Sequence, residues 1–270
     1  MLTIDLIGGN GLIGSAIKRV AKNIKIRDWG INPKSYGYFN LMDENSWDQF
    51  FKTDPKYIIL LAWPGLPNYM GDFHIVNNLT MSIKFIKKLL ENKITKVLVT
   101  GTCYEYGFVD GKINENISTN PHTKYGLAKD TLRIYLEIEA KNKNIDWCWL
   151  RIFYPYSDLA IRPSLYNSLL KAIKNNDKFF ELGSGNQIRD FVLVDNIAIQ
   201  IIELLVNPLS KGVYNGGSGN PCSIKEFANS IIKSKNSNIQ LLFNIKNDRE
   251  YEPKNFWADM SKYKNLISNP

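Results

Sequence analysis

The sequence of 270 residues predicts an α/β fold class: a doubly wound parallel sheet with a small C-terminal lobe laid over it. Three observations predict this architecture. Short aliphatic runs alternate with longer segments of helical apolar spacing, a glycine-rich turn follows the first run, and the alternation loosens after about residue 154. Strands that alternate with helices form parallel sheets covered on both faces.

Five runs have the composition of buried parallel strands, and a segment with helical apolar spacing follows each of them. They are Leu2–Ile7, Ile24–Asp28, Tyr57–Ala62, Lys96–Gly101 and Trp147–Phe153. We assign residues 1–154 to this sheet domain. Residues 155–270 contain turn-rich pieces and are expected to form mainly the lobe, with 188–215 returning to the sheet. Because open parallel sheets bind ligands beyond the carboxyl ends of their strands, we expect a cleft between sheet and lobe.

Composition narrows the class of protein. An apolar content of 44% with 22% charged residues is typical of a globular protein, and the longest apolar run, Tyr57–Trp63, is too short to span a bilayer. The N-terminus begins with a strand-like run and no signal peptide, so a cytoplasmic protein without a membrane partner is expected. The net charge of +8 is spread over scattered lysines, which favours a phosphate-bearing small substrate over nucleic acid.

Cysteines and histidines are few. Cys103, Cys148 and Cys222 lie far apart without CxxC spacing, so we expect neither a disulfide framework nor a metal site. The two histidines, His74 and His122, are interpreted as helix-start or surface residues.

The first chemical signal is GGNGLIG, which places Gly8, Gly11 and Gly14 between the first strand and the following helix. Bare backbone amides and a helix N-terminus at such a turn can bind a diphosphate. This pattern predicts a Rossmann-type dinucleotide-binding domain. Asp28 ends the second strand, where a carboxylate can hold both ribose hydroxyls and would repel a 2'-phosphate. NAD(H) is therefore favoured, while Arg27 and nearby lysines leave NADP(H) open.

Three motifs occur together in order: the glycine turn, TGTCYEYG at residues 100–107, and Tyr125 with Lys129 in YGLAK. In this combination the chain resembles the extended short-chain dehydrogenase/reductases, the NAD-dependent epimerases and dehydratases that act on nucleotide sugars. The resemblance continues through Leu150–Tyr156, Arg189–Ala198, Tyr214–Ala228 and Asp259–Leu266, and so covers nearly the whole chain.

The resemblance implies a set of cofactor-binding positions. They are Gly8, Gly11, Leu12, Ile13, Gly14, Asp28, Asn40, Leu41, Ala62, Trp63, Asn77, Tyr125, Lys129 and Phe153.

Tyr125 and Lys129 stand one helical turn apart and project from one face. A nearby ammonium and an oxidised nicotinamide would lower the pKa of the tyrosine from about 10, so that the phenol can exchange the proton that accompanies hydride transfer. Thr102 occupies the family's Ser/Thr position and would hydrogen-bond the substrate oxygen.

The residues after Thr102 bear on the reaction. The family's sugar dehydratases carry Asp and Glu where this chain has Cys103 and Tyr104, so a 4,6-dehydratase is disfavoured. Glu105 is expected to point away, because alternation along an extended segment would turn it from the side of Tyr104. The related fucose synthases use a cysteine near this position. Cys103 is offset by one residue and lacks a partner histidine, so we favour a buried thiol that contacts the sugar and keep catalysis as the alternative.

The resemblance also implies substrate contacts at Cys103, Tyr104, Tyr154, Arg189 and Arg249. Arg189 matches an arginine that grips the nucleotide diphosphate, and the alternative is a structural ion pair with Asp190 or Asp195. Arg249 would make a second phosphate contact. Tyr154 stands where the family often has an asparagine, so its role is less directly implied.

Taken together, these positions predict an NAD(P)-dependent reductase of a nucleotide-linked 4-keto-6-deoxysugar, in the biosynthesis of a bacterial surface glycan. A C4 epimerase would use the same residues and is the closest alternative. A non-catalytic dinucleotide sensor belongs to another class, and the intact Thr102, Tyr125 and Lys129 speak against it. Family members are often dimers through two helices, which makes a homodimer the expected assembly.

Overall fold

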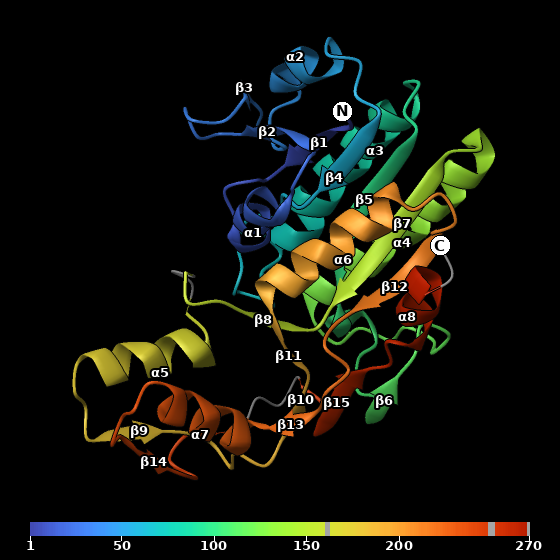
Figure 1. Ribbon diagram of the computed structural model, residues 1–270. Coiled ribbons are helices and arrows are strands. Elements are labelled where there is room, and N and C mark those ends of the chain that lie inside the picture. Colours follow the sequence, from blue (N-terminus) through green and yellow to red (C-terminus); the bar gives the residue numbers. More distant parts are fainter. Residues whose placement is uncertain (160–162, 248–251, 269–270) are drawn as a thin grey trace.

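The computed structural model describes residues 1–159, 163–247 and 252–268 (Figure 1). Its main body is a seven-stranded parallel sheet of order β12-β7-β5-β4-β1-β2-β3. The strands are β1 (Thr3–Ile7), β2 (Lys25–Gly30), β3 (Gly37–Tyr38), β4 (Tyr57–Leu60), β5 (Lys96–Thr102), β7 (Asp146–Ile152) and β12 (Gly212–Gly216). The predicted fold class is confirmed, and all five predicted strands form within two residues of their expected bounds.

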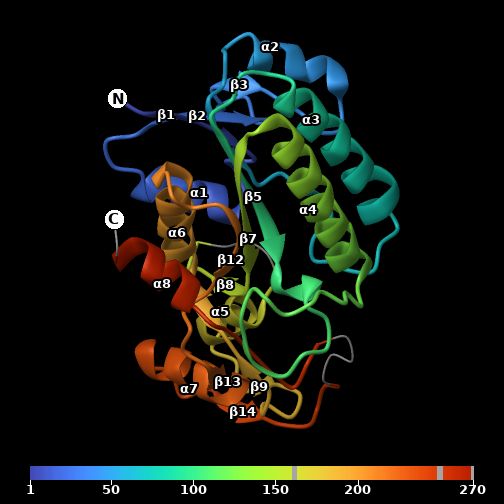
Figure 2. The same cartoon turned by 90° about the vertical axis from the view of Figure 1, so that its right-hand side faces the viewer.

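Helices cover both faces of this sheet. Figure 2 shows α1 (Leu12–Val20) and α6 (Val194–Val206) on one side, with α3 (Thr80–Leu90) and α4 (Lys124–Lys143) on the other. Successive strand residues face opposite sides, so Leu6 packs in the core under α1 and α6 while Ile7 packs under α3 and α4. The six-residue π-helix η2 (His74–Leu79) leads into α3, and η1 (Glu44–Trp47) leads into α2 (Asp48–Phe51).

The lobe lies beyond the carboxyl ends of the strands (Figure 1). It contains α5 (Leu165–Lys174), α7 (Ile224–Ser234) and three small sheets. Their strands are β13 (Cys222–Ser223), β10 (Ile188–Arg189), β15 (Asn255–Ala258) and β6 (Gly111–Ile113) in one sheet, β11 (Phe191–Leu193) with β8 (Tyr154–Tyr156), and β14 (Gln240–Leu242) with β9 (Phe179–Glu181). The helix α8 (Ser261–Ser268) follows β15.

The chain crosses between body and lobe more often than a single boundary at residue 154 allows. β6 comes from the first half of the sequence but pairs with β15. Within 188–215, β10 and β11 belong to the small sheets, whereas α6 packs against α1 and β12 pairs with β7 in the main sheet. Such pairings join distant parts of the chain and leave no local pattern. None of the helices in the described ranges has the length and apolarity needed to cross a membrane.

Candidate active site

A cleft of about 680 Å³ lies where the main sheet meets the lobe. The glycine turn after β1, the end of β5 and the start of α4 form its walls on the side of the sheet. Residues of α5, α7, β9 and β10 form the wall on the side of the lobe. The cleft is therefore at the place where an open parallel sheet binds its ligands.

The glycine turn brings bare backbone to the cleft. Gly8 has φ +93°, and a Cβ there would lie 2.8 Å from the backbone nitrogen of Ala62. A Cβ on Gly14 would lie 2.5 Å from the Cα of Gly9, so neither position accepts a side chain. The helix α1 starts after Gly11, whose place as N-cap offers no side-chain hydrogen bond. Its first N–H groups are thus available to an anion.

Asp28 lies beside this turn and is 8% exposed. Its Oδ2 accepts a hydrogen bond from Lys18 Nζ at 2.5 Å. Its Oδ1 is buried and has no hydrogen-bond partner among the described residues. A buried carboxylate oxygen without a donor is costly, and ribose hydroxyls would satisfy it. The arrangement fits the adenosine end of a dinucleotide.

Arg27 is not a cation of this site. Its guanidinium donates to both carboxylate oxygens of Asp5, at 2.8 and 2.6 Å, and to the Thr53 carbonyl oxygen. Adjacent residues of a strand face opposite sides, which turns Arg27 away from the side of Asp28. The argument for NADP(H) from Arg27 is therefore wrong, and Lys18 is the cation in contact with Asp28.

The structure brings Thr102, Tyr125 and Lys129 together on the cleft wall. Thr102 ends β5, and Tyr125 and Lys129 come from the first turns of α4, which Thr123 caps by accepting from the Gly126 N–H. Lys129 Nζ donates to the Thr100 carbonyl oxygen at 2.8 Å and lies 4.0 Å from the ring centroid of Trp63. The side chain of Thr102 is a hydrogen-bond partner of Tyr125.

Burial has the largest effect on the pKa of Tyr125. It raises the pKa of Tyr125, and nearby Tyr69, Glu105 and Cys103 raise it further. Burial also lowers the pKa of Lys129 to about 7, so this side chain is only partly charged at neutral pH. The expected lowering of the tyrosine's pKa by a neighbouring ammonium is absent from the cofactor-free protein. Here Tyr125 is a neutral phenol, which is a proton donor.

Glu105 lies behind the site and supports Thr102. The segment Cys103–Glu105 is a 3₁₀ turn (η3) rather than an extended strand, so the reason given for excluding Glu105 was wrong although its exclusion from the cleft holds. The fully buried carboxylate accepts from the Thr102 N–H at 2.8 Å, from Trp149 Nε1 and from Arg151 Nε. Thr102 and Glu105 form a capping box, and the sequence pattern TxxE could have revealed it.

The predicted substrate residues Cys103, Tyr104, Tyr154 and Arg189 all line the cleft, whereas Arg249 lies outside the described residues. Tyr104 donates its hydroxyl to Glu252 Oε1 at 2.7 Å, and Arg189 Nη2 donates to Glu252 Oε2 at 3.0 Å. The Arg189 guanidinium also lies 5.4 Å from the ring centroid of Tyr154. Sequence reasoning missed Glu252, because 148 residues separate it from Tyr104.

The two alternative partners of Arg189 are used elsewhere. Asp190 accepts from the backbone N–H groups of Ser218 and Ala258, and Asp195 pairs with Arg19. The ion pair of Arg189 is instead with Glu252, and its Nη1 donates to two backbone carbonyls.

Cys103 is 2% exposed, and burial raises the pKa of its thiol well above the usual range, with Glu252 raising it further. His74 starts the helix η2, which agrees with one of its two expected positions, but it is not a surface residue. It is fully buried, accepts from Trp63 Nε1 at 3.0 Å, and its pKa is lowered by burial. His122 is exposed and packs on Phe108. Among the described residues, the surroundings of Cys103 therefore favour the protonated thiol over the thiolate.

The remaining cofactor positions divide into two groups. Leu12, Ile13, Trp63 and Phe153 line the cleft, and the backbone of Ala62 abuts Gly8. Asn40, Leu41 and Asn77 are not among the lining residues. Asn40 Oδ1 accepts from the Met42 N–H, Leu41 is buried in the core, and Asn77 is exposed on η2. The buried residues of that helix are His74 and Asn78, so the contact expected of Asn77 is not supported by its position.

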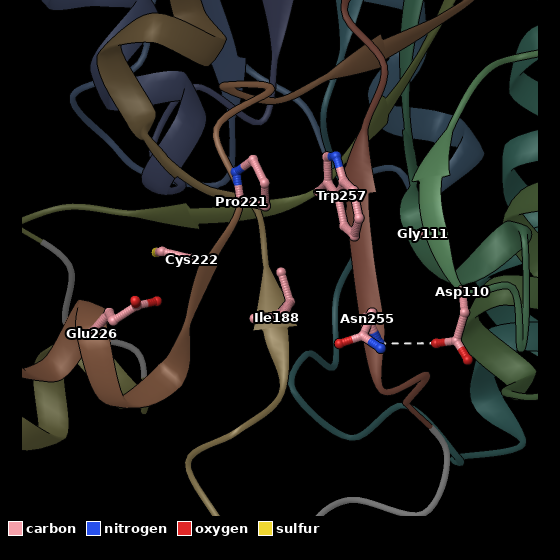
Figure 3. A pocket seen from close by; sticks show the side chains of 8 residues that line it. All are labelled: Asp110, Gly111, Ile188, Pro221, Cys222, Glu226, Asn255 and Trp257. Carbon is pink, nitrogen blue, oxygen red and sulfur yellow. Dashed lines mark hydrogen bonds between the residues drawn. The ribbon is translucent and has the colours of Figure 1, made fainter.

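A second hollow of about 500 Å³ opens on the other face of the small sheet (Figure 3). Ile188 lines it, while the next residue, Arg189, lines the cleft. Trp257 and Cys222 also border this hollow, and the Asn255 N–H donates to Asp110 Oδ1 across it. Within the described part of the chain, no three histidine, cysteine or carboxylate side chains are grouped to hold a metal ion.

The sequence matches a protein-family model and several known enzymes. The model of the NAD dependent epimerase/dehydratase family matches residues 4–217. A dTDP-6-deoxy-L-talose 4-dehydrogenase (NAD(+)) of Aggregatibacter actinomycetemcomitans is 28% identical over 272 residues, which is 95% of this chain and 99% of that enzyme. A dTDP-4-dehydro-6-deoxyglucose reductase of Escherichia coli is 24% identical over 84% of this chain and 79% of its own length.

Solved structures show the same fold. The UDP-N-acetylglucosamine 4-epimerase from Methanobrevibacter ruminantium M1, in complex with UDP-N-acetylmuramic acid, superposes with a TM-score of 0.85 at 23% identity. The match covers 100% of this chain and 93% of that one. The UDP-glucose 4-epimerase of Thermus thermophilus, in complex with NAD, has a TM-score of 0.82 at 16% identity, over 99% and 92% of the two chains.

Proposed function

The chain belongs to the NAD dependent epimerase/dehydratase family, and from this premise we propose that it reduces the C4 ketone of a nucleotide-linked 4-keto-6-deoxysugar. The observation that carries the proposal is the grouping of Thr102, Lys129 and a protonated Tyr125 on the wall of a cleft of about 680 Å³, which the glycine turn also lines. Its cofactor is NAD(H), which the family membership and the buried, unpartnered carboxylate oxygen of Asp28 both favour.

The names of two relatives refine the substrate. Both names refer to a dTDP-linked 6-deoxysugar and to a reaction at C4. The dTDP-6-deoxy-L-talose 4-dehydrogenase matches 95% of this chain. We therefore propose dTDP as the nucleotide and a surface glycan as the destination of the sugar. The cleft extends into the lobe as far as Phe180, Leu182 and Phe227, which provides apolar surface for a base.

The residues of the chain would act as follows. NADH, when bound, supplies the hydride for the ketone carbon. Tyr125 donates the phenolic proton to the ketone oxygen as that oxygen gains charge, and the raised pKa keeps the proton in place until then. Thr102, fixed by the Glu105 capping box, orients the carbonyl by a hydrogen bond. Lys129 holds the cofactor ribose and is itself positioned by the Thr100 carbonyl.

Residues near Thr102 distinguish this reaction from others of the family. Cys103 and Tyr104 supply no carboxylic acid for the loss of water, and Glu105 is committed to Arg151 and Trp149. Cys103 has the raised pKa of a buried thiol, which does not favour base catalysis at a carbon beside the ketone. A C4 epimerase would use the same Thr102, Tyr125 and Lys129 and is the second candidate.

Cofactor stoichiometry separates the two candidates. The protein is incubated with 4-keto-6-deoxysugars linked to dTDP, UDP, GDP or CDP, and the loss of NADH absorbance is followed together with the product. We expect one NADH consumed per molecule of product, with dTDP as the preferred carrier. Interconversion of two C4 epimers without net loss of NADH would replace the reductase by the epimerase. No turnover of any carrier would overturn both.

Exposed apolar side chains on α4 support a homodimer. Leu127, Ile134 and Ile138 are 48%, 44% and 53% exposed and lie on one face of the helix, at spacings of seven and four residues. A stripe of this kind on a body helix is costly in water. We propose that a second copy of the chain covers it.

A further inference from the structure

Lys18 has no role in the catalytic arrangement, yet it reaches Asp28, the residue proposed for the adenosine end of the cofactor site. Its side chain is 36% exposed and comes from the last turn of α1. The Nζ atom lies 2.5 Å from Asp28 Oδ2 and 3.4 Å from Asn10 Oδ1. Lys18 therefore extends along the glycine turn to the residue that is expected to read the ribose.

The two oxygens of Asp28 have different surroundings. Oδ2 is held by Lys18, whereas Oδ1 is buried, has no hydrogen-bond partner among the described residues and faces Gly9. A Cβ on Gly9 would lie 2.0 Å from Oδ1, which shows how closely this oxygen approaches the turn. The ammonium thus holds the carboxylate through Oδ2, while Oδ1 is packed against the glycine turn without a donor among the described residues.

Other cations around this end of the site are engaged or lie in the solvent. Arg27 pairs with Asp5, and Arg19 pairs with Asp195. Lys34 is exposed in the loop after β2, where its backbone N–H is bound by Asn32. Within the described ranges, Lys18 is the cation with a recorded contact to the Asp28 carboxylate.

We propose that Lys18 sets the cofactor selectivity by compensating the charge of Asp28, so that the protein accepts NADPH as a second cofactor beside NADH. This inference rests on the dinucleotide site of the proposed function. An isolated carboxylate repels a 2'-phosphate, but an ammonium 2.5 Å from it offsets that repulsion. The long, half-exposed stem of Lys18 can also turn its ammonium toward a phosphate without moving the backbone.

The test is a binding titration of the cofactor-free protein with NADH and NADPH, followed by nicotinamide fluorescence. Lys18→Met should weaken NADPH binding by roughly fivefold or more, the range for a partly exposed contact between charges, and NADH binding by less than about twofold. Lys18→Arg should keep the ratio of the two affinities within about twofold of wild type. Lys22→Met, a change at an exposed lysine just beyond α1, is the matched control and should leave both affinities unchanged.

Each other outcome overturns the inference in a recognisable way. Equal weakening of NADH and NADPH by Lys18→Met would mean that Lys18 only holds Asp28 in place. Unchanged affinities for both cofactors would mean that Lys18 neither sets the selectivity nor holds Asp28 in place. A wild-type protein that binds NADH but not NADPH would refute the compensation and leave the proposed function intact, whereas a protein that binds neither would refute the proposed function as well. Thermal unfolding of each variant shows whether its fold is retained.

Discussion

Tyr125 is the residue on which the chemistry depends. It lies beside Tyr69, whose ring also contacts Tyr104, so the cleft contains several phenols, but Tyr125 is the one grouped with Thr102 and Lys129. We expect Tyr125→Phe to lower turnover by roughly a hundredfold or more and to leave NADH binding nearly intact, because only the proton donor is removed. Tyr69→Phe is the matched control in steady-state assays and should lose far less. Wild-type turnover in Tyr125→Phe would refute the assignment.

Lys129 makes stability depend on pH. Burial lowers its pKa to about 7 from an ordinary value of 10.5. Between these values the unfolded chain binds the proton that the folded chain has released, so the stability of the fold rises with pH. Without cofactor, we expect the unfolding free energy of the wild type to rise more between about pH 7.0 and 8.5 than that of Lys129→Met. His74 does not interfere, because its lowered pKa acts below pH 6.5. The unfolding free energy is measured by urea unfolding at each pH. If it rises equally with pH in wild type and Lys129→Met, Lys129 is not the titrating group.

At the scale of elements, β10 and η3 decide which side chains enter the cleft. β10 separates two hollows, so Ile188 faces one and Arg189 the other. The turn of η3 brings both Cys103 and Tyr104 to the cleft and places Glu105 in the core, whereas an extended segment would turn Cys103 and Tyr104 to opposite sides. Glu252, which lies just before the start of β15, links the two elements through Tyr104 and Arg189.

The position of Arg189 leads to a binding prediction. Its guanidinium faces the cleft but is held by Glu252, so a diphosphate must share the arginine with this carboxylate. Arg189→Ala should weaken dTDP binding by about 1.5 to 3 kcal/mol, the range for hydrogen bonds to charged groups, without changing NADH affinity. Glu252→Gln removes the competing charge and should tighten dTDP binding. Calorimetric titration with dTDP, UDP, GDP and CDP measures both effects.

A control keeps this prediction interpretable, because Arg189 is buried and its loss could disturb the lobe. Arg189→Lys retains a positive charge without the planar fork and should bind dTDP with intermediate affinity. Equal dTDP affinity in wild type and Arg189→Ala would leave Arg189 with a purely structural role in its pair with Glu252.

At the scale of the whole molecule, the sequence was informative wherever a feature is local. The five strands, the glycine turn and the pair Tyr125 and Lys129 are each encoded within a few residues, and the structure places them as the patterns indicate. Local sequence patterns did not predict contacts between distant segments of the chain. Examples are the pairing of β6 with β15 and the ion pair of Arg189 with Glu252, which are 63 residues apart.

Burial was the other property that local patterns did not reveal. The sequence around His74 predicts a helix start or a surface position. His74 does start η2, but it is buried, with Trp63, Asn68 and the ring of Phe73 around it. The pKa of Tyr125 was expected to fall because Lys129 is one turn away, but burial outweighs that effect and lowers the charge of the lysine too. Side-chain environment is thus a property of the folded molecule.

The assembly gives a prediction for the whole molecule. If a second copy covers the exposed stripe on α4, Ile134→Glu should convert a dimer to a monomer, because a charge at its centre resists burial. Light scattering after gel filtration measures the mass of each. Lys141→Glu, a charge change in the last turn of the same helix, is the control. A monomeric wild type would show that the stripe is not a dimer interface.

In the proposed reaction, NADH transfers hydride to C4 of a nucleotide-linked ketosugar in this cleft, with Tyr125 as proton donor. Its most direct test uses NADH deuterated at the transferred position and a dTDP-linked 4-keto-6-deoxysugar, with the product examined by nuclear magnetic resonance. We expect one deuterium at C4 of the product for each NADH consumed, and labelled product that forms roughly a hundredfold more slowly, or slower still, with Tyr125→Phe. Product that carries no deuterium at C4, or that forms without loss of NADH, would contradict it.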